Sequence, residues 1–191
     1  MKLWRYKNYE EYRAAQEDAN LRKWNRCFVL KDNVEMLSAY IKANVPDLKF
    51  GICHGTRLGK EQEWFRDYLD IEVIGTEISS AATKFPHTIQ WDFHDVKPEW
   101  IGAVDFIYSN SFDHSWKPVE CLDAWMSCIK PGGVCILEWS KCSIPSSKSD
   151  PFGATEAEYE GMILDNYYIQ DRLRAMGKVY PTTFFVVAHA D

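Results

Sequence analysis

The chain has 191 residues, of which 46% are hydrophobic and 15% aromatic, and its formal net charge is −6. This length and composition suffice for one compact core, so neither disulfide bonds nor a structural metal is required. An acidic body argues against a general nucleic-acid-binding protein, which needs a basic face. No segment approaches the roughly 20 apolar residues of a membrane span, so we expect a soluble, cytoplasmic protein.

Positive charge is concentrated at the N-terminus. Residues 1–31 hold eight Lys or Arg and four acids, a net charge of +4, so the remainder carries −10. Residues 8–24 are predicted to form a helix with a sparse apolar stripe of Tyr9, Tyr12 and Leu21. We therefore divide the chain into an N-terminal basic helical extension (1–31) and a main domain (32–191). The extension either packs as a solvated helix at the domain edge or serves as a lid or docking arm.

The main domain alternates between helix and strand signals. In chain order, the first half predicts a helix at 32–44 that Pro46 stops, a strand at 48–53, a helix at 60–69, and strands at 71–74, 88–91 and 104–109. The second half predicts a helix ending near Ile129, a turn at 130–133, a strand at 134–139, a loop at 141–156, a helix at 156–176, and an antiparallel pair at 179–182 and 184–188. This order predicts an α/β fold: a doubly wound, mostly parallel seven-stranded sheet with helices on both faces and an antiparallel C-terminal strand.

The six cysteines form no C-x-x-C pair, the spacing that zinc sites usually need. We expect free thiols in a reducing compartment and no metal site. The cysteines stand at positions 27, 53, 121, 128, 135 and 142.

A glycine-containing turn and a later acid indicate a ribose-binding site. The predicted strand that ends at Cys53 runs into Gly55 and Gly59, where the backbone turns sharply and a ligand could approach closely. Glu77 follows the next strand, 22 residues after Gly55. In a doubly wound sheet an acid at that point faces the crevice above the glycine turn and can accept hydrogen bonds from both ribose hydroxyls. Alternatively, the glycines only close a turn and Glu77 is a surface acid.

Five motifs in succession resemble those of the class I methyltransferases, which use S-adenosylmethionine. The similarity covers roughly residues 48–140, and its most specific part is the Lys-Pro-Gly-Gly turn before a strand. The motifs are FGICHGTRLG, VIGTEIS, TIQWDFHD, DFIYSNSFDHSW and LDAWMSCIKPGGVCILEW.

The resemblance implies a set of cofactor-binding residues. The loop around the methionine half would hold Gly51, Cys53, His54, Gly55 and Thr56; Glu77 with Ile78 would bind the ribose; Asp92 and Phe93 would recognise adenine; and Ser109, Asn110 and Ser111 would lie beside the methyl group.

The loop departs from the family pattern of acid-x-Gly-x-Gly-x-Gly. Gly51 stands where the acid is expected, Cys53 where the first glycine is expected, and Arg57 where the last is. The missing carboxylate removes a partner for the cofactor's ammonium group, and His54 or a backbone carbonyl is a candidate substitute.

Methyl transfer mainly requires an acceptor atom held against an electrophilic methyl group, with a base where a proton must leave. His114 is the candidate base, because imidazole accepts protons near neutral pH, and Asp113 would orient it or act alone. In the competing interpretation His114 only caps a helix or shapes the pocket.

Other functions are less well supported. The Asp/Asn-Pro-Pro-aromatic motif of enzymes that methylate base amino groups is absent from residues 109–112, and G-x-G-x-x-G, expected of an NAD-dependent oxidoreductase, is absent after the first strand. A non-catalytic cofactor-binding or partner-binding module of the same fold stays open. Since the chain has no large inserted domain, the acceptor is expected to be a small molecule or a substrate presented by a partner.

Overall fold

The computed structural model describes residues 1–190. Its helices are α1 (Tyr9–Arg22), α2 (Lys31–Asn44), α3 (Lys60–Leu69), α4 (Pro118–Cys128) and α5 (Glu156–Leu164). Its strands are β1 (Lys2–Leu3), β2 (Phe50–His54), β3 (Glu72–Glu77), β4 (Thr88–Gln90), β5 (Val104–Ser109), β6 (Ile129–Ser140), β7 (Phe152–Gly153), β8 (Tyr168–Met176) and β9 (Pro181–Ala188). Short 3₁₀ turns include η3 (Phe112–His114) and η4 (Lys141–Ser143).

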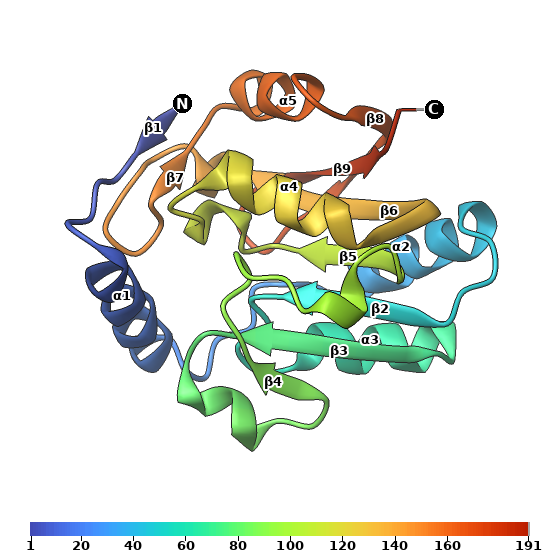
Figure 1. Ribbon diagram of the computed structural model, residues 1–191, viewed down its shortest axis with the longest axis horizontal. Coiled ribbons are helices and arrows are strands. Elements are labelled where there is room, and N and C mark those ends of the chain that lie inside the picture. The colour runs from blue at the N-terminus through green and yellow to red at the C-terminus, as the bar shows by residue number, and fades with distance from the viewer. Residues whose placement is uncertain (191) are drawn as a thin grey trace.

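Within residues 1–190, seven strands form one sheet in the order β4-β3-β2-β5-β6-β9-β8. Neighbours from β4 to β6 pair in parallel, whereas β9 is antiparallel to both β6 and β8. The order reverses at β2, because β3 lies on one side of it and β5 on the other (Figure 1). The predicted fold class is confirmed, and the reversal at β2 is where such sheets bind ligands.

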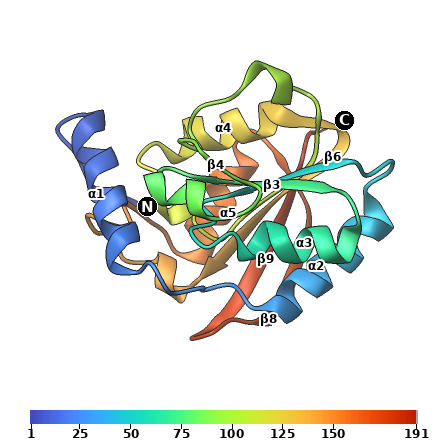
Figure 2. The same ribbon diagram turned by 90° about the horizontal axis from the view of Figure 1, so that it is seen from below.

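Helices cover both faces of the sheet (Figure 2). On one face α2 and α3 bury Leu37, Ile41 and Phe65 against the strands. On the other, α4 and α5 bury Trp125 and Tyr159. Each such side chain stabilises the fold by about 1.5–3 kcal/mol through the apolar surface it removes from water. The predicted helical spacing in 32–44 and 122–129 therefore does mark the core-facing stripes.

The predicted helix at 156–176 is wrong in its second half. The helix α5 begins at a capping box formed by Thr155 and Glu158, and it ends at Leu164. Residues 168–176 instead form the edge strand β8, where only Ile169 is fully buried. An edge strand has one neighbour and an exposed side, so its many charged residues leave little period-two pattern to read.

The predicted C-terminal strand pair is also wrong. Residues 181–188 form the single strand β9, which pairs with β6 on one side and β8 on the other. The turn at 130–133 is not a separate connection either, because it lies within β6 as an irregularity of the ladder. Gly132 there has a φ of 78°, which favours glycine.

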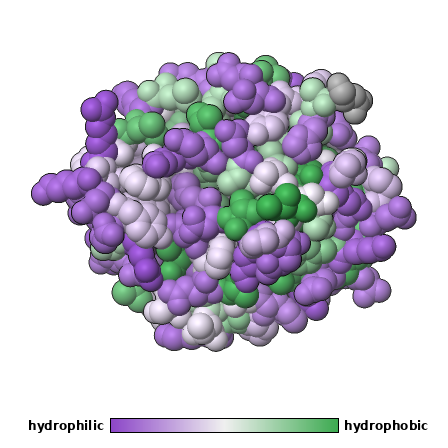
Figure 3. Space-filling view, viewed as in Figure 1, coloured by the Kyte–Doolittle hydropathy of each residue, from purple (hydrophilic) through white to green (hydrophobic). Residues whose placement is uncertain are grey.

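The N-terminal segment lies beside the carboxyl ends of the parallel strands (Figure 1). Strand β1 pairs with β7, so this segment is tied to the loop that follows β6. The face shown in Figure 3 is mostly hydrophilic, with small groups of apolar side chains. None of the helices in residues 1–190 combines the length and the apolar character needed to span a lipid bilayer.

Candidate active site

Two adjoining cavities lie at the carboxyl edge of the sheet. The larger has a volume of about 280 Å³ and lies between the loop after β2, the start of α3, the ends of β5 and β6, and the β8–β9 turn. The smaller, of about 40 Å³, lies under α1. Both are lined in part by Gly55, Arg57, Ser111 and His114. This is the position that the reversal of strand order predicts for a ligand.

The turn after β2 brings Gly55 against the end of β5. Gly55 has a φ of 76°, and a Cβ there would lie 2.6 Å from Cβ of Ser111, so only glycine fits. Two residues on, Arg57 adopts a φ of 28°, so a non-glycine residue holds a position in the loop that glycine would occupy more easily. The loop therefore keeps its sharp turn and adds a charged side chain to it.

Glu77 lies at the end of β3, beside this turn. Its Oε1 accepts a hydrogen bond from the backbone N–H of Ser79 at 2.9 Å, and its Oε2 accepts one from that of Arg57 at 3.2 Å. Burial raises the pKa of Glu77, which these hydrogen bonds and the charge of Arg57 oppose. Ile78 lines the smaller cavity with it. The carboxylate is thus fixed by backbone groups and still faces the cavity.

Asp92 and Phe93 line the smaller cavity from the segment after β4. Oδ2 of Asp92 accepts a hydrogen bond from the hydroxyl of Tyr9 at 2.8 Å, and its Oδ1 lies 2.7 Å from Nδ1 of His94. Burial tends to raise the pKa of Asp92, but the contacts with His94 and Tyr9 outweigh it, and the pKa lies below its ordinary value. Asp92 is therefore held as a carboxylate by α1 and His94.

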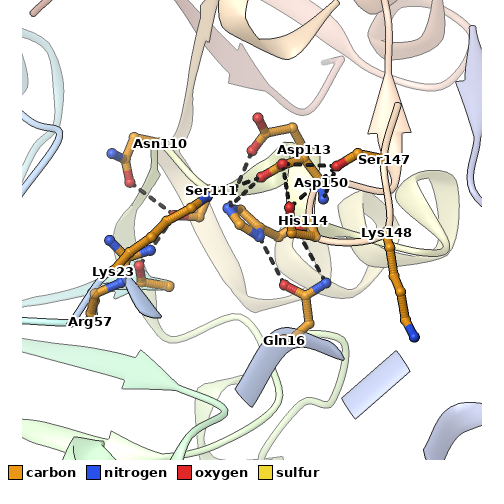
Figure 4. Close-up of polar contacts among 12 residues, drawn as sticks. Gln16, Lys23, Arg57, Asn110, Ser111, Asp113, His114, Ser147, Lys148 and Asp150 are labelled. Atoms are coloured by element: carbon orange, nitrogen blue, oxygen red, sulfur yellow. Dashed lines mark hydrogen bonds and ion pairs between the residues drawn. The ribbon is translucent and has the colours of Figure 1, made fainter. Parts of the chain in front are cut away.

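His114 stands between α1 and two acids (Figure 4). Its Nδ1 lies 2.9 Å from Oε1 of Gln16, and its Nε2 lies 3.5 Å from Asp150 and 4.0 Å from Asp113. Because an amide oxygen only accepts, Nδ1 donates, and the neutral ring carries its lone pair at Nε2. Burial raises the pKa of Asp113, and its contact with His114 opposes that rise.

Four of the sequence-predicted site residues line neither cavity: Gly51, Cys53, His54 and Ser109. A Cβ at Gly51 would overlap the ring of Phe106, so glycine is required there for packing. Cys53 is completely buried in the core. The structure thus assigns both residues a packing role.

His54 and Ser109 are held by hydrogen bonds inside the sheet. The imidazole of His54 stacks on Trp125 and lies 2.8 Å from Oγ1 of Thr76, and burial lowers its pKa to about 3. Ser109 donates to the carbonyl oxygen of His54 at 2.9 Å and accepts from the N–H of Ser111. His54 therefore points away from the cavities, whereas Thr56 and Asn110 line the larger one.

Sequence reasoning missed two acids in the larger cavity, Glu61 in α3 and Glu138 in β6. Burial raises the pKa of each to about 7. Glu138 accepts a hydrogen bond from the hydroxyl of Tyr108 at 2.5 Å. The signal for Glu138 was available, because it is the one acid within the apolar run of 134–139. Glu61 gave no signal, since acids are common in the first turn of a helix.

The sequence also left the role of α1 open. Tyr12 is 1% exposed and stacks on Trp116 at 5.4 Å between ring centroids, which packs α1 over the smaller cavity.

Residues 1–190 contain no cluster of three His, Cys, Asp or Glu side chains that could hold a metal ion.

No protein-family model matches the chain, and no curated protein matches it in sequence. Several solved structures do match it in fold. The chain is similar to the 1,6-didemethyltoxoflavin-N1-methyltransferase of Burkholderia thailandensis, which was solved with 1,6-didemethyltoxoflavin and S-adenosylhomocysteine. The TM-score is 0.74, the sequence identity is 11%, and the match covers 98% of this chain and 93% of that one.

A second similar structure is the magnesium protoporphyrin IX methyltransferase of Synechocystis PCC 6803 with bound SAM (TM-score 0.67, 12% identity, 97% and 100% coverage). A third is the [4+2]-cyclase SpnF (TM-score 0.61, 10% identity, 82% and 81% coverage). Identities this low establish a shared fold and leave the reaction to be argued from the site. This chain has the fold of the class I methyltransferases.

Proposed function

We propose that this protein is an S-adenosylmethionine-dependent methyltransferase that acts on a small-molecule acceptor. The observation that carries the proposal is the placement of Glu77 beside the Gly55 turn, at the point where the strand order reverses. A backbone-fixed carboxylate at that point suits the two hydroxyls of a ribose. Similar structures that contain S-adenosylhomocysteine or SAM support the choice of cofactor.

The residues present fit such a ligand in chemistry, and α1 limits the space. Glu77, Asp92 and Phe93 offer two carboxylates and an aromatic ring around the smaller cavity. Its volume of about 40 Å³ is too small for an adenosine group. Because α1 forms one wall through Tyr12 and Gln16, we propose that residues 1–31 act as a lid that moves when the cofactor enters.

The cofactor, when bound, supplies an electrophilic methyl group. The chain's own part is to position the acceptor, to exclude water and to remove a proton where the acceptor has one. We assign the proton to Nε2 of His114, which lines both cavities. Gln16 holds the opposite ring nitrogen, and Asp113 and Asp150 stabilise the imidazolium. We therefore propose for His114 and Asp113 the roles that the sequence suggested.

The acceptor is proposed to be a small molecule that binds in the larger cavity. A volume of about 280 Å³ suits a compact ligand, and the lining mixes basic side chains (Lys23, Lys178) with acids (Glu138, Asp113). The Burkholderia structure, which holds 1,6-didemethyltoxoflavin together with S-adenosylhomocysteine, supports an acceptor of this size.

Isothermal titration tests the cofactor assignment. The purified protein is titrated with S-adenosylmethionine, S-adenosylhomocysteine and, as a control, NAD. Micromolar binding of the two sulfur compounds without NAD binding supports the proposal and justifies an acceptor screen. NAD binding alone would overturn it.

A non-catalytic module of the same fold is the second candidate. One observation favours it: both oxygens of Asp92 are already engaged, by Tyr9 and His94. Absence of binding by all three titrants, also after deletion of residues 1–24, would favour this second function.

A further inference from the structure

Two residues that line the larger cavity each carry a buried polar atom without a hydrogen-bond partner, and the two atoms are of opposite polarity. Oε2 of Glu61 accepts no hydrogen bond from any of residues 1–190. Within the same described part of the chain, Nε of Arg57 finds no acceptor. Both residues line this cavity, and Glu61 is 6% exposed. Leaving such groups unpaired destabilises the folded state, and does so more strongly when they are charged.

The two side chains do not satisfy each other. Within residues 1–190, no salt bridge joins them, and Arg57 instead donates from Nη1 to the carbonyl oxygen of Arg26 at 3.2 Å. Its guanidinium also lies 5.5 Å from the ring centroid of Phe28. These contacts hold the guanidinium in place. None of residues 1–190 supplies an acceptor for Nε, and a bound ligand can supply one.

We propose that Glu61 and Arg57 together bind an α-amino acid group, with Glu61 taking the ammonium and Arg57 the carboxylate. The ammonium and carboxylate of such a zwitterion are attached to the same carbon atom. The ammonium is a donor for Oε2 of Glu61, and the carboxylate is an acceptor for Nε of Arg57. Charge-assisted hydrogen bonds of this type are about twice as strong as neutral ones.

This inference rests on the proposed function, because the amino acid group is assigned to the methionine half of the cofactor. Two observations support that source. Gly55 and Thr56 of the β2 turn line the same cavity as the pair. No side chain at Gly51 could supply the ammonium's carboxylate, since Phe106 fills the space, and His54 faces the core. Glu61 therefore replaces the acid that the loop lacks.

Three ligands distinguish the contribution of Glu61 to binding from that of Arg57. S-Adenosylhomocysteine carries ammonium and carboxylate, its decarboxylated analogue carries only the ammonium, and 5′-methylthioadenosine carries neither. Glu61→Gln is expected to weaken the first two at least tenfold and to leave the third unchanged. Arg57→Gln is expected to weaken only the first, also at least tenfold. Calorimetry on the full chain measures all nine combinations of ligand with wild type and these two variants.

Glu63→Gln is the matched control. Glu63 lies in the same turn of α3 but is exposed and pairs with Lys60 at 2.8 Å, so this variant should bind all three ligands as the wild type does. Unchanged binding of 5′-methylthioadenosine also shows that each variant is folded.

The outcomes distinguish this inference from the proposed function. If the wild type binds S-adenosylhomocysteine no more tightly than 5′-methylthioadenosine, the cofactor assignment stands and the amino acid site is refuted. A uniform loss for all three ligands in Glu61→Gln also refutes it. Binding of none of the three by the wild type overturns both. Free L-methionine is titrated as well. If Glu61→Gln weakens binding of L-methionine but leaves the affinity for S-adenosylhomocysteine unchanged, the site belongs to an acceptor and our assignment to the cofactor is wrong.

Discussion

The hydroxyl of Tyr9 donates a 2.8 Å hydrogen bond to Oδ2 of Asp92, across 83 positions of the sequence. This contact fastens α1 to the segment after β4, above the smaller cavity. It also occupies an oxygen that the adenine ring is proposed to need. We therefore propose that this bond opens when the cofactor enters.

Tyr9→Phe should make the proposed lid easier to open. A hydrogen bond to a charged group contributes about 1.5–3 kcal/mol, so the association rate for S-adenosylhomocysteine should rise several-fold, as measured by stopped-flow fluorescence. Tyr168→Phe, on the exposed edge strand β8, is the control for loss of a tyrosine hydroxyl. An unaltered rate in Tyr9→Phe would mean that α1 does not gate the site.

Glu77→Ala should weaken S-adenosylhomocysteine binding by at least ~1.5 kcal/mol, because charge-assisted hydrogen bonds to two ribose hydroxyls are lost. The substitution also leaves the N–H groups of Arg57 and Ser79 without their acceptor, so thermal unfolding is recorded in parallel. Glu72→Ala, at the exposed start of the same strand, should change neither quantity. Equal affinity in a folded Glu77→Ala protein would remove Glu77 from the site.

Glu138→Gln should stabilise the protein at alkaline pH. Burial raises the pKa of Glu138 to about 7. Between the unfolded pKa and this value, Glu138 is protonated in the folded state and ionised in the unfolded state. For this group, stability falls as pH rises from the unfolded pKa of about 4.3 to about 7 and is then constant. The variant avoids that loss, so it should be more stable than the wild type by roughly 3–4 kcal/mol at pH 8 and by little at pH 4.5.

Urea unfolding at pH 4.5, 6, 7 and 8 measures this difference. The amide that replaces the carboxyl group in Glu138→Gln keeps an oxygen that can accept from Tyr108, so the hydrogen bond is conserved. The charge of Glu138 contributes to the raised pKa of Glu61, so Glu138→Gln also relieves part of the Glu61 shift, which acts in the same direction at alkaline pH. Glu72→Gln controls for the loss of an exposed acid. A stability difference that does not change with pH would contradict the raised pKa.

Gly51→Ala should destabilise the protein by about 1–3 kcal/mol, because its Cβ would overlap the Phe106 ring. Phe106→Leu in the same chain should recover part of that loss. Gly161→Ala is the opposite control: space is open there in α5, so stability should rise by about 0.5–1 kcal/mol. Chemical denaturation measures all of these variants. If Gly51→Ala instead leaves stability intact and abolishes ligand binding, Gly51 acts in the site.

His114→Ala should lower methyl transfer about 10²–10⁴-fold, the usual contribution of a general base. S-Adenosylhomocysteine affinity should change by less than threefold. Single-turnover transfer to an acceptor from the screen provides the measurement. Because the contact with Gln16 of α1 is also lost, Gln16→Ala serves as the control and should alter the rate much less. Full activity in His114→Ala would leave that residue a purely structural role.

The sequence by itself determined the order of strands and helices from α1 to β6, since apolar runs and helical spacing follow directly from which faces are buried. It also determined the acid at the end of β3 and the glycine turn beside it. It failed at residues 165–176, because an edge strand gains its backbone partners from β9 and needs no apolar pattern of its own.

Only the tertiary structure decided which polar residues share a cavity. Glu61, Glu138 and Arg57 come from separate elements, and nothing in their local sequence indicates that they face the same space. The same holds for Tyr9 on Asp92 and Gln16 on His114, contacts 83 and 98 positions apart. Periodicity reports burial along one element, whereas a site depends on how the ends of several elements meet, and chain folding alone brings them together.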